Sequence, residues 1–162
     1  MQGERARWRD LRFAVEELNF DYARVLNDGK IEQWPDFFTE DAVYRVTGKE
    51  NADRNLAAGI IYCEGKGMLK DRAYALAHTA TFAPRYTQHY ITNVRITNVE
   101  AEIVSAEANY LVLETLVDEP TKILQAGEYH DRLLNADGRL LIKERQCIYH
   151  TLVIPNALVF PV

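Results

Sequence analysis

The second half of the chain alternates apolar and polar residues over long stretches, and this pattern constrains the fold more than any other. From Val104 to Val112, every second residue is apolar. A period of two places neighbouring side chains on opposite faces of a β-strand. We predict four long antiparallel strands, over residues 86–99, 102–117, 121–134 and 139–153. A sheet with one apolar face must be covered, so the first half of the chain has to supply the covering layer.

The segment Asn135-Ala136-Asp137-Gly138 predicts a tight hairpin between the last two of these strands. A three-residue loop closed by Gly138 would place Leu134 opposite Leu140 and Asp131 opposite Lys143. This register pairs apolar with apolar and acid with base, which favours it.

Helices are predicted over most of the first half. Apolar residues recur at three- and four-residue steps from Trp8 to Val25, which indicates an amphipathic helix ending near Gly29. A short helix from Ile31 to Phe38 follows, with Trp34, Phe37 and Phe38 on one face. A strand over residues 43–47, an exposed excursion over 48–55, a short strand over 60–63 and a third helix over 67–79 complete the pattern. The inner face of that third helix is predicted to consist of Leu69, Ala73, Leu76 and Ala77. Helices followed by a long meander indicate an α+β fold, with a curved sheet folded around the helices as a cone.

Composition limits the function classes. At 162 residues and 48% apolar residues, the chain suits a single domain over 1–162. The net charge of −5 and the lack of a basic run argue against nucleic acid, and no apolar stretch reaches the length of a membrane span. The N-terminus lacks the apolar core of a secretion signal. We therefore expect a soluble cytoplasmic protein in which Cys63 and Cys147 are free thiols.

The segment around Trp34 carries a resemblance to a known family. Trp34, Phe37-Phe38, Asp41, Tyr44 and Val46 follow the pattern W..FF..D..Y.V. Further similarity lies in Gly59-Ile60-Ile61-Tyr62, Met68-Leu69-Lys70-Asp71-Arg72 and Gly127-Glu128-Tyr129. The chain resembles, over nearly its whole length, the small (β) subunits of Rieske-type aromatic-ring-hydroxylating dioxygenases. Among them it is most similar to the small subunits of terephthalate and salicylate oxygenases.

The resemblance implies a fold, a role and partners. The fold would be the NTF2-like (SnoaL-like) cone, with N-terminal helices packed in a strongly curved, mostly antiparallel sheet. The role would be that of a non-catalytic structural subunit, forming a trimer beneath three large (alpha) subunits in an α3β3 oxygenase. The large subunit would carry a Rieske [2Fe-2S] cluster and mononuclear Fe(II), supplied with electrons from NAD(P)H through a reductase or ferredoxin. Its reaction would be the O2-dependent hydroxylation of an aromatic, carboxylated compound.

The residues themselves give no complete set of iron ligands. A Rieske cluster needs two Cys and two His, whereas the chain has two isolated cysteines and four histidines. Cys147 and His150 have a suitable spacing, but no first half of the motif exists, and on a strand they would point to opposite faces. Gly65-Lys66-Gly67 is too short for a phosphate loop, and Ser105 is predicted on an outer strand face. We therefore predict no catalytic, cofactor-binding or metal-binding residue in this chain.

Two other functions stay open on the residues alone. Cone folds also host isomerases, cyclases and dehydratases, which hold carboxylate, His and Tyr side chains in the hollow. The candidates for such a standalone enzyme, acting on a hydrophobic small molecule, are Tyr22, Asp36, Asp41, Tyr44, His89 and Tyr129. A ligand-binding or adaptor module is the third class. A buried carboxylate of raised pKa beside a His would favour an enzyme, whereas a filled hollow would favour the subunit.

The remaining histidines and the C-terminal segment have structural interpretations. His78 is predicted at the end of the third helix. His89 is a core histidine, a pocket residue or an interface contact. His130 shares a face with Glu128 and Arg132, opposite Glu144 in the predicted register, and His150 continues that polar, solvated or subunit-facing surface. The apolar segment 152–162 is predicted to dock on the chain's own core or on a neighbouring subunit.

Overall fold

The computed structural model describes residues 2–79, 83–151 and 160–162. The helices are α1 (Gln2–Asn27), the 3-10 helix η1 (Ile31–Phe37), α2 (Lys49–Asp53) and α3 (Gly65–His78). The strands are β1 (Phe38–Gly48), β2 (Ile61–Glu64), β3 (Arg85–Glu100), β4 (Ile103–Leu116), β5 (Lys122–Ala136) and β6 (Arg139–Tyr149). Every predicted helix and strand is present, and the four long strands lie where the alternation placed them. The last strand ends at Tyr149, before the predicted end at residue 153, which lies outside the described residues.

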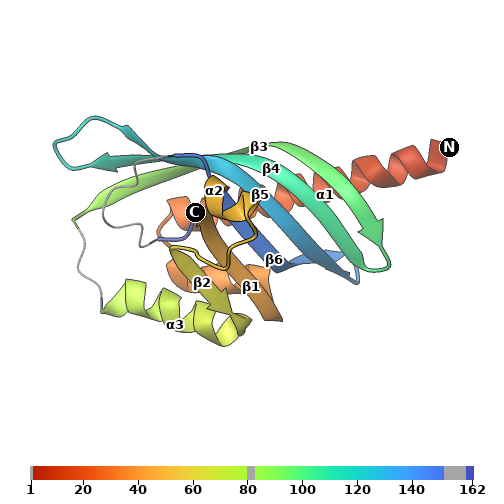
Figure 1. The fold of residues 1–162 in the computed structure, drawn as a ribbon, viewed down its shortest axis with the longest axis horizontal. Helices are drawn as coiled ribbons and strands as arrows, with labels where there is room; N and C mark the ends of the chain where they lie inside the picture. The colour runs from red at the N-terminus through yellow and green to blue at the C-terminus, as the bar shows by residue number, and fades with distance from the viewer. Residues whose placement is uncertain (1, 80–82, 152–159) are drawn as a thin grey trace.

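All six strands form one curved sheet in the order β2-β1-β6-β5-β4-β3. Neighbouring strands are antiparallel except β1 and β6, which run parallel. In Figure 1 the long strands β3, β4 and β5 arch over α1, while α3 lies at the opposite side, near β1 and β2. The predicted α+β architecture, with a curved sheet wrapped around the helices, is confirmed.

The predicted register of the β5–β6 hairpin is wrong. Its loop is the two residues Asp137 and Gly138, both with positive φ (51° and 84°), as a type I′ turn requires. Leu134 therefore lies opposite Leu141 rather than Leu140. An irregularity after Arg132 shifts the pairing by one further residue. As a result Asp131 faces Arg145 and His130 faces Gln146, while Lys143 forms an ion pair with Asp41 of β1.

Each long helix buries the apolar face that its sequence pattern predicts. On α1 the residues Val15, Asn19, Tyr22 and Leu26 are all buried, which is the spacing of one helix face. Trp8, nearer the N-terminus, is 37% exposed, because α1 extends beyond the sheet there (Figure 1). On α3, Leu69, Ala73 and Leu76 are buried as predicted. Ala77 is exposed, so that part of the prediction is wrong; it borders a cavity instead.

An aromatic cluster joins η1 to the sheet. Trp34 and Phe38 are fully buried, and Phe37 is partly buried. The rings of Trp34, Phe38 and Tyr44 meet edge to face, with centroids 5.1 to 6.0 Å apart. Such pairs stabilise a core beyond the area that they bury. The segment that resembles the oxygenase subunits therefore forms one side of the core.

Candidate functional site

The six predicted candidates do not form one site. Tyr22, Tyr44 and Tyr129 meet in the interior and are fully buried. Asp36 is exposed, and Asp41 is exposed on the outer surface. Hydrogen bonds from Lys143 and Thr39 lower the pKa of Asp41. A catalytic carboxyl group in a hollow has a raised pKa instead, so Asp41 does not fit that role. His89 lies apart, against Asn27 of α1.

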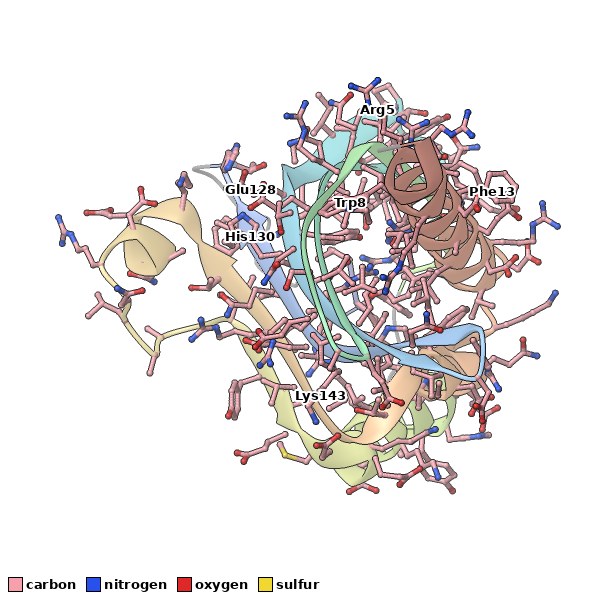
Figure 2. All side chains as sticks on the ribbon, turned by 90° about the vertical axis from the view of Figure 1, so that its right-hand side faces the viewer. Arg5, Trp8, Phe13, Glu128, His130 and Lys143 are labelled. Atoms are coloured by element: carbon pink, nitrogen blue, oxygen red, sulfur yellow. The ribbon has the colours of Figure 1, made fainter. Side chains whose placement is uncertain are left out.

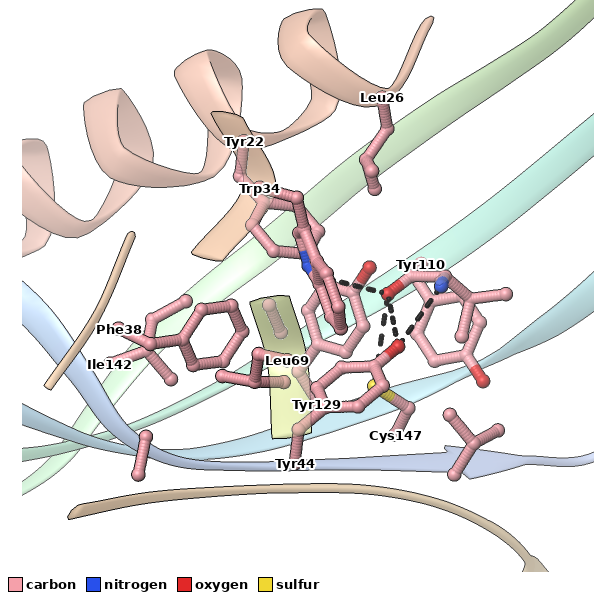
Figure 3. Packing of buried hydrophobic residues seen from close by; sticks show 14 of the residues in the cluster. Tyr22, Leu26, Trp34, Phe38, Tyr44, Leu69, Tyr110, Tyr129, Ile142 and Cys147 are labelled. Carbon is pink, nitrogen blue, oxygen red and sulfur yellow. Dashed lines mark hydrogen bonds between the residues drawn. The ribbon is translucent and has the colours of Figure 1, made fainter. Parts of the chain in front are cut away.

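The interior of the cone is filled by its own hydroxyl groups and by Val162. Tyr22 accepts a hydrogen bond from the Trp34 indole (3.1 Å) and donates one to the main-chain carbonyl of Val162 (3.0 Å). Tyr44 contacts the same carbonyl at 3.2 Å and accepts the Val162 N–H at 3.0 Å. These rings gather in one cluster between α1 and the sheet, beside Cys147 (Figure 3). For residues 160–162, docking on the chain's own core is confirmed; residues 152–159 of the predicted segment lie outside the described residues.

A buried ion pair, which was not predicted from the sequence, lies against the rings of the buried tyrosines. Arg145 is 0% exposed and binds both carboxylate oxygens of Asp131, at 2.9 and 2.7 Å. Its Nη2 also donates to Asn19 Oδ1 at 2.6 Å. The guanidinium lies 4.5 Å from the ring centroid of Tyr22 and 4.1 Å from that of Tyr129. The wrong hairpin register concealed this pair, because it placed Lys143 opposite Asp131.

The electrostatics of the interior keep these groups in one protonation state. Burial alone lowers the pKa of Arg145, but the adjacent Asp131 carboxylate reverses this and raises it well above the usual value. Burial raises the pKa of Tyr22, Tyr44 and Tyr129, and it raises the pKa of Cys147 to about 12. The tyrosines and the thiol are therefore neutral at pH 7. They are suited to hydrogen bonding rather than to proton transfer near neutrality.

The outer face of β5 and β6 carries a second, exposed polar cluster. Glu128 Oε1 lies 3.6 Å from the Nε2 atoms of both His130 and His150, and 3.8 Å from Lys49 Nζ. Figure 2 shows Glu128 and His130 on the side of the sheet away from α1. This confirms the predicted polar outer face. His150 lies on it while Cys147 is buried, so the two do point to opposite faces.

The other predicted residues have structural environments. His78 closes α3 and contacts Glu32 of η1 at 3.0 Å. Cys63 and Cys147 are free, buried thiols, as predicted. Over the described parts of the chain, no group of three or more His, Cys, Asp and Glu side chains is arranged to hold a metal ion. Within the same residues no helix has the length and apolarity needed to cross a bilayer.

Fold and interior together define a class: an NTF2-like, SnoaL-like cone whose interior, in the described residues, is occupied by buried side chains and by Val162. The chain belongs to the ring hydroxylating beta subunit family, whose model matches residues 22–156. It is 31% identical to the anthranilate 1,2-dioxygenase small subunit of Burkholderia cepacia, covering 93% of both chains. It is also 31% identical to subunit beta 2 of the terephthalate 1,2-dioxygenase terminal oxygenase component of a Comamonas species, covering 91% of this chain and 96% of that one.

Solved structures agree with this assignment. A protein from Novosphingobium aromaticivorans, proposed to be the β subunit of an aromatic-ring-hydroxylating dioxygenase, is 40% identical with a TM-score of 0.85. The alignment covers 93% of this chain and 95% of that one. A proposed scytalone dehydratase from the same organism matches at 23% identity and a TM-score of 0.65, which shows a shared fold alone. The predicted family, and its kinship with terephthalate oxygenase subunits, are confirmed. The chain is a small subunit of an aromatic-ring-hydroxylating dioxygenase.

Proposed function

We propose that this chain acts as a non-catalytic structural subunit, with residues 1–162 forming one β-subunit domain. The filled hollow is the observation that carries this proposal. The main chain of Val162 binds the hydroxyls of Tyr22 and Tyr44, two of the groups that a standalone enzyme would need for its substrate. The interior carboxylate, Asp131, is bound on both oxygens by Arg145, so it is not available as a general base. In this proposal no residue of the chain takes part in the oxygenase chemistry.

The proposed partner is a large oxygenase subunit, in an α3β3 assembly that stands on a trimer of this chain in the cytoplasm. Small subunits of multicomponent dioxygenases pair with such a subunit. The large subunit would hold the Rieske [2Fe-2S] cluster and the mononuclear Fe(II), which supply electron transfer and O2 activation, with a reductase or ferredoxin as the electron source. Anthranilate and terephthalate, named for the two relatives, are both aromatic carboxylates. We therefore propose a carboxylated arene as the substrate of the complex.

The physical role proposed for the chain is to fix the relative positions of the large subunits. One continuous sheet, internally cross-linked by the Asp131–Arg145 pair, is a rigid element for that purpose. Rigid supports of this kind hold reacting groups in place better than loops do. Large subunits that trimerise and turn over normally without this chain would refute the role.

Native mass spectrometry of the tagged chain, captured from its host grown on an aromatic carboxylate, tests the assembly. Three copies of this chain, three of a larger partner and bound iron are expected. An iron-free homo-oligomer without a partner, despite good expression, would contradict the proposal. Turnover of an arene by the isolated chain would contradict it as well, and would favour the standalone enzyme.

A further inference from the structure

The first turns of α1, residues 2–12, lack the packing of the rest of that helix; we call this segment the arm. The remainder of α1 buries one residue on every turn, at Val15, Asn19, Tyr22 and Leu26. Among the described side chains of the arm none is buried. In Figure 1 this end of α1 runs past the ends of the strands. A few helical turns without tertiary contacts are marginally stable in water, so a surface that covers the arm would stabilise it.

The apolar stripe of α1 continues into the arm and remains partly uncovered there. Leu11 and Trp8 precede Val15 at steps of four and three residues. Leu11 packs against the core, whereas Trp8 is 37% exposed. Figure 2 looks onto the free end of α1 and shows Trp8 on the side of the helix that faces the strands, with Phe13 on the opposite side. Tryptophan is among the side chains that contribute most to binding between proteins, so Trp8 suits a contact with a second molecule.

The charge of the arm is positive and largely unpaired. It holds four arginines against two acidic residues. Arg12 contacts Glu16 at 3.6 Å, but Arg5 and Arg9 are exposed and form no ion pair with the part of the chain that the structure describes. Both lie within one turn of Trp8, on the same side of the helix. Cations near the N-terminus of a helix oppose its dipole, so an acidic partner surface would favour the arm twice over.

A second copy of the chain offers such an acidic surface. The whole chain carries −5 and the arm +2, which leaves −7 on residues 13–162. This charge repels nucleic acid and anionic membranes and attracts the arm of another copy. Glu100 and Glu102 flank the turn between β3 and β4, are exposed, and form no ion pair within the described residues. The Glu102 carbonyl accepts the Asn135 N–H at 2.8 Å, which ties this turn to the end of β5. The two carboxylates therefore stand on a fixed turn.

We propose that the arm of one copy binds the β3–β4 turn of the next copy. Arg5 and Arg9 pair with Glu100 and Glu102 of that copy, and Trp8 packs against the same turn. The inference rests on the proposed trimer of this chain and names the surfaces that form it. Because the two surfaces differ, the contact is head-to-tail, and three such contacts can close a ring.

Charge reversal tests the contact. Sedimentation equilibrium at low salt measures self-association of the full chain without the large subunit, and the wild type is expected to associate. The arm variant (Arg5→Glu with Arg9→Glu) and the turn variant (Glu100→Arg with Glu102→Arg) place like charges opposite each other. Each alone should associate about a hundredfold more weakly. Mixed together, the two variants bring opposite charges into contact again, and association should return to within about tenfold of the wild type.

Two further measurements separate this contact from a general effect of charge. Arg54→Glu with Lys122→Glu changes the net charge as the arm variant does, at exposed positions on α2 and β5, and should associate as the wild type does. Trp34 is fully buried, so acrylamide quenching of the tryptophan fluorescence reports mainly on Trp8. Quenching should decrease as the wild-type concentration rises, and should stay constant for the arm variant.

A wild-type chain that stays monomeric at every concentration would overturn the proposal. Arm and turn variants that associate as the wild type does would overturn it too, as would a mixture that shows no recovery. If the arm variant self-associates normally but no longer captures the large subunit, the arm belongs to that subunit and the proposal is wrong. The trimer itself is judged separately, by the number of copies in the captured complex, and can stand when the arm contact fails.

Discussion

The two faces of the β5–β6 hairpin carry similar charged groups in opposite surroundings. On the inner face, the side chains of Arg145 and Asp131 are 0% and 1% exposed and make two hydrogen bonds to each other. On the outer face, Glu128 contacts His130 and His150, whose side chains are 45% and 47% exposed. Water screens the outer contacts, so they contribute little to stability. Breaking the inner pair would leave a charge without water or a partner. Burial rather than residue type therefore decides how much stability is lost when an ion pair is broken.

Arg145→Leu should cause the largest loss of stability among these variants. It leaves the Asp131 carboxylate buried and unpaired, which lowers the free energy of unfolding by about 3–5 kcal/mol. Urea unfolding followed by circular dichroism measures this change. The double variant Arg145→Leu with Asp131→Leu should recover part of the loss, because no lone charge remains. A single variant that loses less than about 1 kcal/mol would show that the inner pair behaves like a surface pair.

His89 extends the comparison to a buried group that titrates. Its pKa of about 4 in the folded chain is below the value of 6.5 in the unfolded chain. Between these values the unfolded chain binds more protons, so stability is present at higher pH and is lost as pH falls through this window. From pH 7 to pH 5 the loss due to His89 is about 2 kcal/mol. The pH dependence of unfolding should shrink by this amount in His89→Gln, and should persist in His130→Gln.

Tyr22→Phe removes a neutral group from the same interior. The variant loses the hydrogen bond to the Val162 carbonyl and leaves the Trp34 indole N–H without its acceptor. We expect a loss of about 1–2 kcal/mol in the free energy of unfolding. Tyr74→Phe, at a tyrosine that is 60% exposed, is the control and should change stability little. Equal effects of the two variants would argue against a specific role for the interior hydroxyl.

Glu128→Gln should cause the smallest loss of stability among these variants. The substitution removes the charge shared by Lys49, His130 and His150 on the outer face. Exposed pairs contribute less than about 1 kcal/mol each, and added salt weakens them further. Unfolding of the isolated chain at low and high salt tests this expectation. A loss comparable with that of Arg145→Leu would remove the distinction between the two faces.

Much of the fold could be predicted, because the period of two and the helical spacings are local signals. The contacts between residues inside the cone were harder to predict from the sequence. The hairpin has a two-residue turn at Asp137-Gly138 and one irregularity after Arg132. Asp131 therefore lies opposite Arg145 and not opposite Lys143, the predicted neighbour. The contact of His89 with Asn27 spans 62 residues, and no local pattern indicates it. The tyrosines were correctly proposed as interior groups, but their partners depend on the register of the sheet.

The contacts of Val162 also bear on how the chain folds. Its carbonyl meets Tyr22 across a sequence separation of 140 residues and Tyr44 across 118. Closing loops of this length is entropically unfavourable and slows folding. During synthesis, the hydroxyls of Tyr22 and Tyr44 emerge long before their shared acceptor. These two hydrogen bonds can therefore form only after β6 has been synthesised, and until then both hydroxyls lack this acceptor.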